Sequence, residues 1–437
     1  MLIGEDIVPE RVLISDSVQS RNFRGKLSVD ETLAFKLETS AERRGLADGS
    51  KGSPLLNGLD YFPSGSMIDG FPAALLSRCQ MRNIKGTVCL MASIWRARVR
   101  INMQSLVELW IIFSTLICMH NEQGNAASDY PPLTLDYYKS TCPTVFEIVR
   151  KEMECAVLSD PRNAALVVRL HMHDCFVQGC DGSVLLDDTI DLQGEKKASE
   201  NIHSLKGFRL IDRIKNMLES ECPGIVSCAD ILTIAARDAV ILVGGPYWDV
   251  PLGRKDSRTA SLELANSNLP DANEGLLSIL SKFIYQGLSV TDTVALLGSH
   301  TIGMARCVNF RPRIYGDFEA TSDKTPISEA YLSNLKSICP TVGGDKNITA
   351  MDNVTPNLFD NSFYLTLVRG EGLLNSDQEM YSSVFGIETR KLVNKFAEDP
   401  IAFFQQFSES MVKMGNITNS DSFVTGEVRR NCRFVNT

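Results

Sequence analysis

The chain contains 437 residues, of which 44% are hydrophobic and 22% are charged, and it carries a formal net charge of −9. These fractions are typical of a folded globular protein and exclude a wholly disordered or fibrous chain. The negative charge, without any basic run interleaved with aromatic residues, excludes nonspecific binding to nucleic acid.

Residues 1–102 mix charged residues with Gly and Ser, as in the stretch AERRGLADGSKGS, and show no sustained helical or strand periodicity. We predict a mostly disordered N-terminal extension without chemistry of its own. Two explanations for it stay open. Either Met91 or Met103 is the true initiator, or the extension is a cytosolic tail in front of a signal anchor.

Residues 103–127 have the pattern of a secretory signal peptide. Basic residues precede the segment, an apolar core covers about 106–119, and small residues follow at Ala126 and Ala127. The core is shorter than the ~20 residues that a membrane span needs. We therefore expect cleavage, secretion, and no stable membrane insertion of the mature protein.

Residues 128–437 read as one mainly α domain with long loops and few strand signals. A helix is predicted over 162–177 after Asp160-Pro161, and another over 228–244, ending at a pair of glycines. Ser289 and Asp292 predict a capping box at the start of a third helix, and 402–415 predicts a fourth.

Nine of the twelve cysteines lie in the segment from Cys142 to Cys432, and none of these nine forms a CxxC pair. That spacing disfavours a zinc ribbon or a thioredoxin-like site. Downstream of a secretory signal, it favours a disulfide framework over scattered buried thiols.

The stretch RLHMHDCFVQGCDG begins at Arg169 and lies inside the first predicted helix. Arg169 and His173 are four residues apart and therefore share one helix face, whereas His171 points away. We predict that His171 is buried and satisfied by backbone groups. An imidazole that moves a proton and a guanidinium that stabilises an anion suit the cleavage of a peroxide O–O bond. That chemistry also needs a cofactor to accept oxygen.

The chain has five histidines, and His300 is the best candidate ligand for a haem iron. It lies in the predicted apolar helix with Gly298, Ser299 and Gly303 around it, and these small residues are expected to leave room for a flat macrocycle. A haem-free zinc hydrolase built on His171 and His173 is the weaker alternative, because histidines two apart on a helix diverge.

Several long segments resemble the secretory plant (class III) haem peroxidases, in order and spacing, over residues ~129–437. They are RLHMHDCFVQGCDGSVLLD, GEKKASEN, CPGIVSCADILTIAARD, VALLGSHTIGMARC, TPNLFDNSFY and GLLNSDQEMYSS. The resemblance implies the plant haem-peroxidase fold, in which two helical halves sandwich one haem b. It implies reduction of hydrogen peroxide and one-electron oxidation of small phenolic donors through a ferryl and porphyrin-radical state. A catalytically weak cell-wall binding protein with the same fold is the alternative.

The resemblance also assigns roles to matching residues. His173 matches the distal acid and base, Arg169 the distal arginine, and Asn201 the asparagine that bonds the other ring nitrogen of the histidine. His300 matches the axial iron ligand, and Asp377 its hydrogen-bond partner.

Two calcium sites and four disulfides are likewise implied by the resemblance. The first calcium set is Asp174, Val177, Gly179, Asp181 and Ser183, with Glu195 linking it to Asn201. The second set is Thr301, Asp352, Thr355, Leu358 and Asp360. The disulfides pair Cys142 with Cys222, Cys175 with Cys180, Cys228 with Cys432, and Cys307 with Cys339. Cys155 is expected to be a free, buried thiol.

Pro270 matches a proline that lines the site for aromatic donors, although the following Asp271-Ala272 departs from the family pattern. Met172 replaces the usual aromatic residue between the two histidines, from which we expect altered donor preference and self-oxidation. Sequons occur at Asn347, Asn353 and Asn416. We expect a monomeric glycoprotein of the extracellular space or cell wall.

Overall fold

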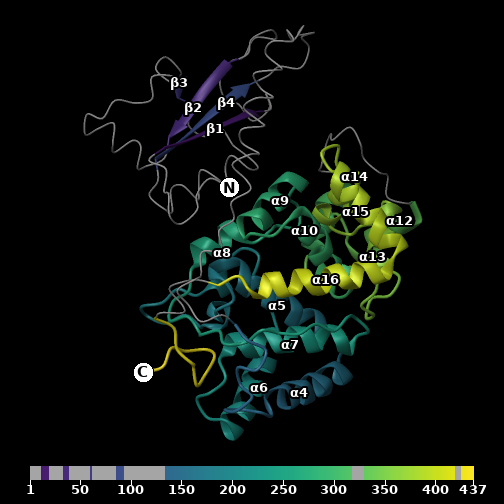
Figure 1. Cartoon of the computed structure of the whole chain (residues 1–437). Helices are drawn as coiled ribbons and strands as arrows, with labels where there is room; N and C mark the ends of the chain where they lie inside the picture. The colour runs from purple at the N-terminus through teal and green to yellow at the C-terminus, as the bar shows by residue number, and fades with distance from the viewer. Residues whose placement is uncertain are drawn as a thin grey trace, which may run out of the picture. The chain divides into compact units, whose positions relative to one another are not determined.

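The structure is a computed structural model that describes residues 11–18, 33–38, 60–61, 85–92, 133–316, 329–418 and 425–437. The predicted signal segment, 103–127, lies outside these residues. The chain divides into two compact units, Met1–Asp129 and Tyr130–Thr437, which are drawn in Figure 1.

The first unit contains four described strands, namely β1 (Arg11–Val18), β2 (Leu33–Glu38), β3 (Asp60–Tyr61) and β4 (Lys85–Ala92). They form one sheet in the order β1-β4-β2-β3. β1 and β4 are parallel, with Arg11 opposite Lys85, whereas β2 and β4 are antiparallel. The sequence pattern predicted no strand here, because these runs do not alternate regularly between apolar and polar residues. The expected disorder of this extension stays a prediction.

The second unit is mainly helical, as predicted. Its first four α-helices are α4 (Val145–Ser159), α5 (Arg162–Gln178), α6 (Phe208–Glu221) and α7 (Cys228–Leu242). The next are α8 (Leu262–Asn268), α9 (Leu276–Tyr285), α10 (Val290–Leu297), α11 (Cys307–Tyr315) and α12 (Glu329–Ile338). The last are α13 (Ser362–Val368), α14 (Asn375–Ser382), α15 (Ile387–Glu398) and α16 (Pro400–Gly415).

Short 3-10 helices and one small ribbon complete the second unit. The 3-10 helices are η3 (Ser183–Leu185), η4 (Glu195–Lys197) and η5 (Gly298–Thr301). The ribbon pairs β5 (Met304–Arg306) with β6 (Ile348–Ala350) in antiparallel fashion. In the part of the chain that the structure describes, none of the helices has the length and apolar character to cross a bilayer.

The helix α7 is the centre of one helical layer. All of its residues from Cys228 to Val240 are buried, because α4, α5 and α6 pack around it. Its start is fixed by Ser227, whose side chain accepts the N–H of Asp230, and the chain turns away at Gly244 with φ +96°. Both ends agree with the predicted helix over 228–244.

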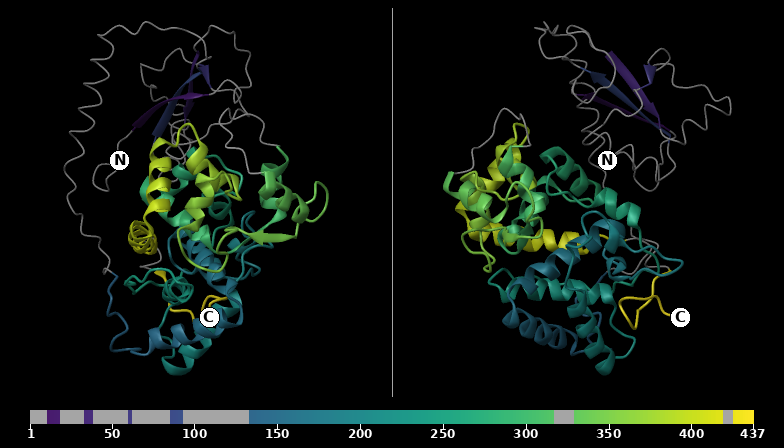
Figure 2. Two further views of the ribbon diagram at one scale, coloured as in Figure 1. Left: turned by 90° about the vertical axis from the view of Figure 1, so that its right-hand side faces the viewer. Right: turned by 180° about the vertical axis from the view of Figure 1, so that it is seen from behind.

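The helix α16 runs between this layer and a second group that contains α10, α13 and α15, as Figures 1 and 2 show. The rings of Phe403 and Phe407 on α16 pack with the ring of Phe359, and all three are fully or almost fully buried. Phe359 and Phe403 stack with centroids 5.7 Å apart, and Phe359 meets Phe407 edge-on at 4.7 Å. This aromatic cluster joins α16 to the α10–α15 group.

The predicted helix that contains His300 ends earlier than expected. The capping box is present, since Ser289 and Asp292 exchange both hydrogen bonds, but α10 stops at Leu297 and the tighter η5 carries His300. Gly298 was expected to leave room for a macrocycle. Instead, a Cβ there would lie 2.3 Å from the Tyr364 hydroxyl and 2.6 Å from the Phe403 ring, so the glycine serves close packing.

Candidate active site

The helix α5 brings Arg169 and His173 together on one face, as the spacing predicted. Arg169 Nε donates to His173 Nε2 at 3.1 Å. The Arg169 guanidinium is held from its other side by the backbone carbonyl of Glu200 at 2.8 Å and the Ser204 hydroxyl at 3.1 Å. The only sequence signal for these two anchors is that both lie within three residues of Asn201.

The His173 ring is oriented by Asn201, which lies just after η4. His173 Nδ1 donates to Asn201 Oδ1 at 2.6 Å, and Asn201 Nδ2 donates to the Glu195 carbonyl at 2.9 Å. The second bond fixes which end of the amide faces the ring, so the proton of a neutral His173 sits on Nδ1. Its Nε2 therefore keeps a lone pair on the Arg169 side.

Burial and charge keep this imidazole neutral. Burial, together with the positive charge of Arg169, lowers the pKa of His173 well below its ordinary value, and the Asn201 hydrogen bond opposes this only in part. Burial also lowers the pKa of Arg169, to about 10, so the guanidinium stays cationic at neutral pH. The pair can accept a proton on one group while the other supports a developing negative charge.

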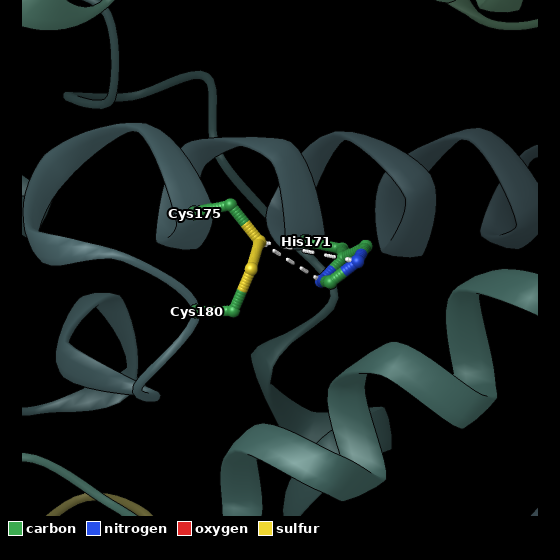
Figure 3. A group of neighbouring side chains, drawn as sticks. All are labelled: His171, Cys175 and Cys180. Atoms are coloured by element: carbon green, nitrogen blue, oxygen red, sulfur yellow. Dashed lines mark hydrogen bonds between the residues drawn. A yellow bond between two sulfur atoms is a disulfide. The ribbon is translucent and has the colours of Figure 1, made fainter. Parts of the chain in front are cut away.

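His171 lies on a different side of α5, against the Cys175–Cys180 disulfide (Figure 3). Its Nδ1 is 3.6 Å from Cys175 Sγ, and the ring is buried. Burial, with the charge of Arg254, lowers the pKa of His171 to about 3. The predicted burial is confirmed, but the described partner is a disulfide sulfur rather than a backbone group.

Within the described residues, the ring of His171 and the sulfurs of Cys175 and Cys180 lie close enough together to hold a metal ion. Because both sulfurs are joined in a disulfide, neither offers a thiolate, and His173 is not in the group. This arrangement gives no support to a zinc centre on His171 and His173.

A second histidine, His300 of η5, faces Asp377 of α14. His300 Nδ1 donates to Asp377 Oδ1 at 2.8 Å. Asp377 is 1% exposed, whereas the His300 side chain is 29% exposed, so the ring projects from a buried anchor towards open space. Phe363 packs edge-on against the ring at 6.1 Å. Among the described residues no partner is recorded for His300 Nε2, so an imidazole held in this way suits an axial metal ligand.

Acidic side chains gather at the C-terminal end of α5. Asp174 Oδ2 accepts the N–H of Gly182 at 2.9 Å, and Asp181 Oδ1 accepts that of Ser183 at 3.0 Å. Glu195 is buried beside them, and within the described residues neither its Oε2 nor the hydroxyl of Ser183 has a hydrogen-bond partner. Burial and mutual repulsion raise the pKa of Asp174 and of Glu195 well above the ordinary range. Three buried carboxyl groups, with the Glu195 Oε2 and the Ser183 hydroxyl left unpaired beside them in the described part of the chain, fit a hard cation.

The backbone that closes this cluster is shaped by the chain after α5. Val177 lies in the last turn of the helix, and Gly179 leaves it with φ +93°. The Cys175–Cys180 disulfide then closes the loop. The residues assigned to the first calcium set are thus adjacent in the folded chain.

The second acidic cluster lies beside His300. Thr301 donates its hydroxyl to Asp352 Oδ2 at 3.1 Å and, in an alternative hydrogen bond, to Asp360 Oδ1 at 3.2 Å. Thr355 reaches Asp352 Oδ2 at 3.5 Å, and the Leu358 N–H is bonded to the Thr355 carbonyl at 3.0 Å. Burial, with a contribution from Asp360, raises the pKa of Asp352. These oxygens also fit a hard cation.

All four expected disulfides form, joining Cys142 to Cys222, Cys175 to Cys180, Cys228 to Cys432, and Cys307 to Cys339. The expectation for Cys155 was wrong in one respect. Its thiol is free, but it is exposed rather than buried, because Cys155 lies on the face of α4 that points away from α7.

Pro270 follows α8 and is half-buried, and Asp271 next to it interacts with the carboxyl group of Glu200. Burial, with repulsion from Asp271, raises the pKa of Glu200 to about 7. Because the Glu200 carbonyl holds Arg169, the Pro270 segment belongs to the Arg169 side of the domain. Met172 is half-buried and packs against the main hydrophobic core.

Comparisons with known proteins agree with this arrangement. The family model described as Peroxidase matches residues 149–399. Peroxidase 11 of Arabidopsis thaliana is 73% identical over 308 residues, which cover 70% of this chain and 92% of that protein. Peroxidase 15 and Peroxidase 49 of the same plant are 46% and 50% identical, over 76% and 69% of this chain and 97% and 90% of their own lengths.

The mainly α fold and the match to the Peroxidase family model define a peroxidase. The chain belongs to the peroxidase family and, within it, to the secretory plant (class III) haem peroxidases. It is therefore a haem-dependent oxidoreductase that acts on hydrogen peroxide and a reducing donor.

Proposed function

We propose that the protein is a secreted enzyme that reduces hydrogen peroxide at His173 and Arg169 and oxidises small phenolic donors in one-electron steps. The neutral His173, with its Nε2 lone pair facing Arg169, takes the proton from the near oxygen of the peroxide and returns it to the departing oxygen. Arg169 stabilises the negative charge that builds up between these two events. Asn201 keeps the ring in the one tautomer that can do this.

We assign His300 as the axial ligand of haem b, with one haem per chain. When bound, the haem supplies the oxygen-accepting and electron-storing chemistry that no side chain provides. Asp377 accepts the Nδ1–H of His300 and gives the ring anionic character, which strengthens it as a ligand.

We assign one calcium ion to each acidic cluster. Asp174, Asp181, Ser183 and Glu195, with the Val177 and Gly179 carbonyls, would hold the first. Thr301, Asp352, Thr355, Asp360 and the Leu358 carbonyl would hold the second. Buried carboxylates that repel one another support the assignment, since a cation removes that repulsion. The two ions would brace the segments that carry Asn201 and His300.

We further propose that Pro270 lines the entrance for phenolic donors and that the enzyme works as a monomer. The signal-like segment 103–127 supports secretion to the extracellular space or cell wall, with residues 1–127 removed or never made. N-terminal sequencing of the protein purified from the apoplast tests this, with a start near residue 128 expected. A mature protein that retains residues 1–102 would overturn it.

The observation that carries the proposal is the hydrogen-bonded series Arg169–His173–Asn201, in one domain with the His300–Asp377 pair. The test compares two histidines in the haem-loaded protein. His173→Asn should lower kcat/KM for peroxide by about 10²- to 10⁴-fold. His203→Asn changes an exposed histidine at φ +61°, a conformation that Asn tolerates, and should leave the rate unchanged. A His173→Asn variant as fast as the parent would overturn the proposal.

A further inference from the structure

Tyr247 is an exposed tyrosine whose hydroxyl is hydrogen-bonded to a proton acceptor, the carboxylate of Asp249. Its side chain is 63% exposed, and its hydroxyl donates to Asp249 Oδ1 at 2.8 Å. Behind it, the guanidinium of Arg237 lies 5.4 Å from the Tyr247 ring and 5.2 Å from that of Phe146. The phenol is thus held at the surface by a carboxylate on one side and a cation on the other.

The next residue, Trp248, turns inward and begins a continuous series of ring contacts. Trp248 is 6% exposed, and its ring centroid lies 5.9 Å from that of Phe407. Phe407 contacts Phe403 at 5.8 Å, and Phe403 contacts Tyr364 at 5.0 Å.

The series ends at the candidate iron ligand. Tyr364 is fully buried and lies 5.2 Å from Phe363, which lies 6.1 Å from His300. Trp248 and Tyr364 are aromatic groups that can be oxidised by one electron. The phenylalanines between them are not, but they keep the series closely packed, without the gaps that slow electron transfer.

We propose that Tyr247 is a second oxidation site, at which the enzyme withdraws electrons from phenolic groups on polymers that are too large to approach the haem. This inference rests on the proposed function, because peroxide turnover supplies the oxidant. The Tyr247 side chain contacts Asp249 and Arg237, whereas the Arg169 guanidinium contacts a different set, namely His173, Glu200 and Ser204.

The step balances in electrons and protons. Tyr247 gives one electron through Trp248 and Tyr364 to the oxidised centre that peroxide leaves behind, and the O–H proton passes to Asp249. The neutral tyrosyl radical then takes one electron and one proton from a phenol of the polymer. The phenol leaves as a phenoxyl radical, and Tyr247 and Asp249 are ready for another cycle once Asp249 releases its proton to water.

A second exposed tyrosine offers a matched control. Tyr137 is 42% exposed, and its ring lies 4.9 Å from that of Tyr138. In the described part of the chain, its recorded ring contacts stop there and do not lead to His300. Tyr137 should therefore be far less oxidised by the enzyme than Tyr247.

The first experiment locates the radical without measuring turnover. The haem-loaded enzyme is treated with hydrogen peroxide and a nitrone spin trap in the absence of donor, and the adducts are mapped by peptide mass spectrometry. We expect an adduct on Tyr247 and little on Tyr137. Trp248→Phe, which keeps a ring in the core, should remove the Tyr247 adduct. Its persistence in that variant, or its absence from the parent enzyme, would overturn the proposal.

The second experiment compares donors of one chemistry and two sizes, free guaiacol and guaiacyl groups coupled to soluble dextran. Tyr247→Phe and Asp249→Asn should lower kcat/KM for the dextran-bound phenol on the order of tenfold, while guaiacol and the Tyr137→Phe control keep parental rates. Parental rates on both donors in Tyr247→Phe would refute the surface site. Failure of the parent enzyme to oxidise even guaiacol would instead refute the proposed function.

Discussion

The imidazole of His300 donates from Nδ1 to the buried carboxylate of Asp377 at 2.8 Å, across 77 residues of sequence. The hydrogen bond fixes the direction in which His300 Nε2 points. The Asp377 carboxylate is buried, whereas the His300 ring is partly exposed. The charge of Asp377 is therefore available to the ring rather than to solvent.

Replacing Asp377 by Asn keeps the size of the side chain and removes its charge. We expect the reduction potential of the bound iron to rise and the rate with peroxide to fall about tenfold to a hundredfold. Spectroelectrochemical titration and stopped-flow absorbance measure the two effects. Asp136→Asn, at an exposed position, is the control, and an unchanged potential in Asp377→Asn would contradict the role assigned to the pair.

Asn201→Ala removes the acceptor of the His173 Nδ1–H. The ring can then rotate or change tautomer, so kcat/KM for peroxide should fall about tenfold to a hundredfold while the steps that oxidise the donor are affected less. Asn266→Ala provides the comparison, because that amide also accepts a nearby backbone N–H, from Ser199, but does not touch His173. Equal losses in both variants would point to a general effect of the loop.

Glu200 should make stability depend on pH. Its folded-state pKa of about 7 lies above the ordinary 4.5, so the folded protein binds this proton more tightly than the unfolded chain does. Ionisation therefore opposes folding as the pH rises from 4.5 through about 7, and the penalty is absent below this window. Glu200→Gln should raise Tm at pH 8 and not at pH 4.

The side chain of Glu200 is only part-buried, so solvent screening limits this gain to about 2 °C. Differential scanning calorimetry of the two proteins at both pH values measures it. The exposed Glu398→Gln should show no such difference between the two pH values. A gain from Glu200→Gln that is equal at pH 4 and pH 8 would rule out this titration as the cause.

Removal of calcium should destabilise the domain. With free calcium at about a hundredfold excess over Kd, binding contributes roughly 3 kcal/mol for each site. Chelation should lower Tm, and elemental analysis of the untreated protein should give two calcium ions for each chain. Asp181→Asn should lose one ion and Asp352→Asn the other. A Tm that changes neither on chelation nor on addition of calcium would contradict the assignment.

Cys155 should react with a thiol reagent in the folded state. A chain that starts at residue 128 has one free cysteine, and it is exposed. Titration with a chromogenic disulfide should give about one thiol per chain without denaturant, and Cys155→Ser should give none. A thiol that reacts only after unfolding would show that the Cys155 side chain is buried in the folded protein.

The residues that the sequence placed correctly are those whose position follows from local periodicity or from a close family pattern. Arg169 and His173 share a helix face because they are four residues apart, and the Ser289 capping box is a local motif. Their partners come from distant segments, and the resemblance supplied Asn201 and Asp377, which would otherwise look like ordinary loop residues.

What local reasoning missed depends on three-dimensional packing. Gly298 is small because Tyr364 and Phe403 press against it, and neither is near it in sequence. His171 meets Cys175 Sγ because Cys175 lies one turn further along α5, and the turn at Gly179 only brings Cys180 back to complete the disulfide. Cys155 is exposed because α4 covers α7 with its other face, and the short strands between Arg11 and Ala92 lack a long alternating pattern.

The N-terminus of α7 depends on the last residues of the chain. The Asp256 carboxylate accepts the N–H groups of Cys228 and Ala229 and also that of Arg429. The Cys228–Cys432 disulfide spans 204 residues, a loop for which chain-entropy models give about 5 kcal/mol. The helix α7 therefore cannot reach its final state until the segment that contains Arg429 and Cys432 has been synthesised. A nascent chain stalled before Cys432 would remain incompletely folded and a substrate for chaperones.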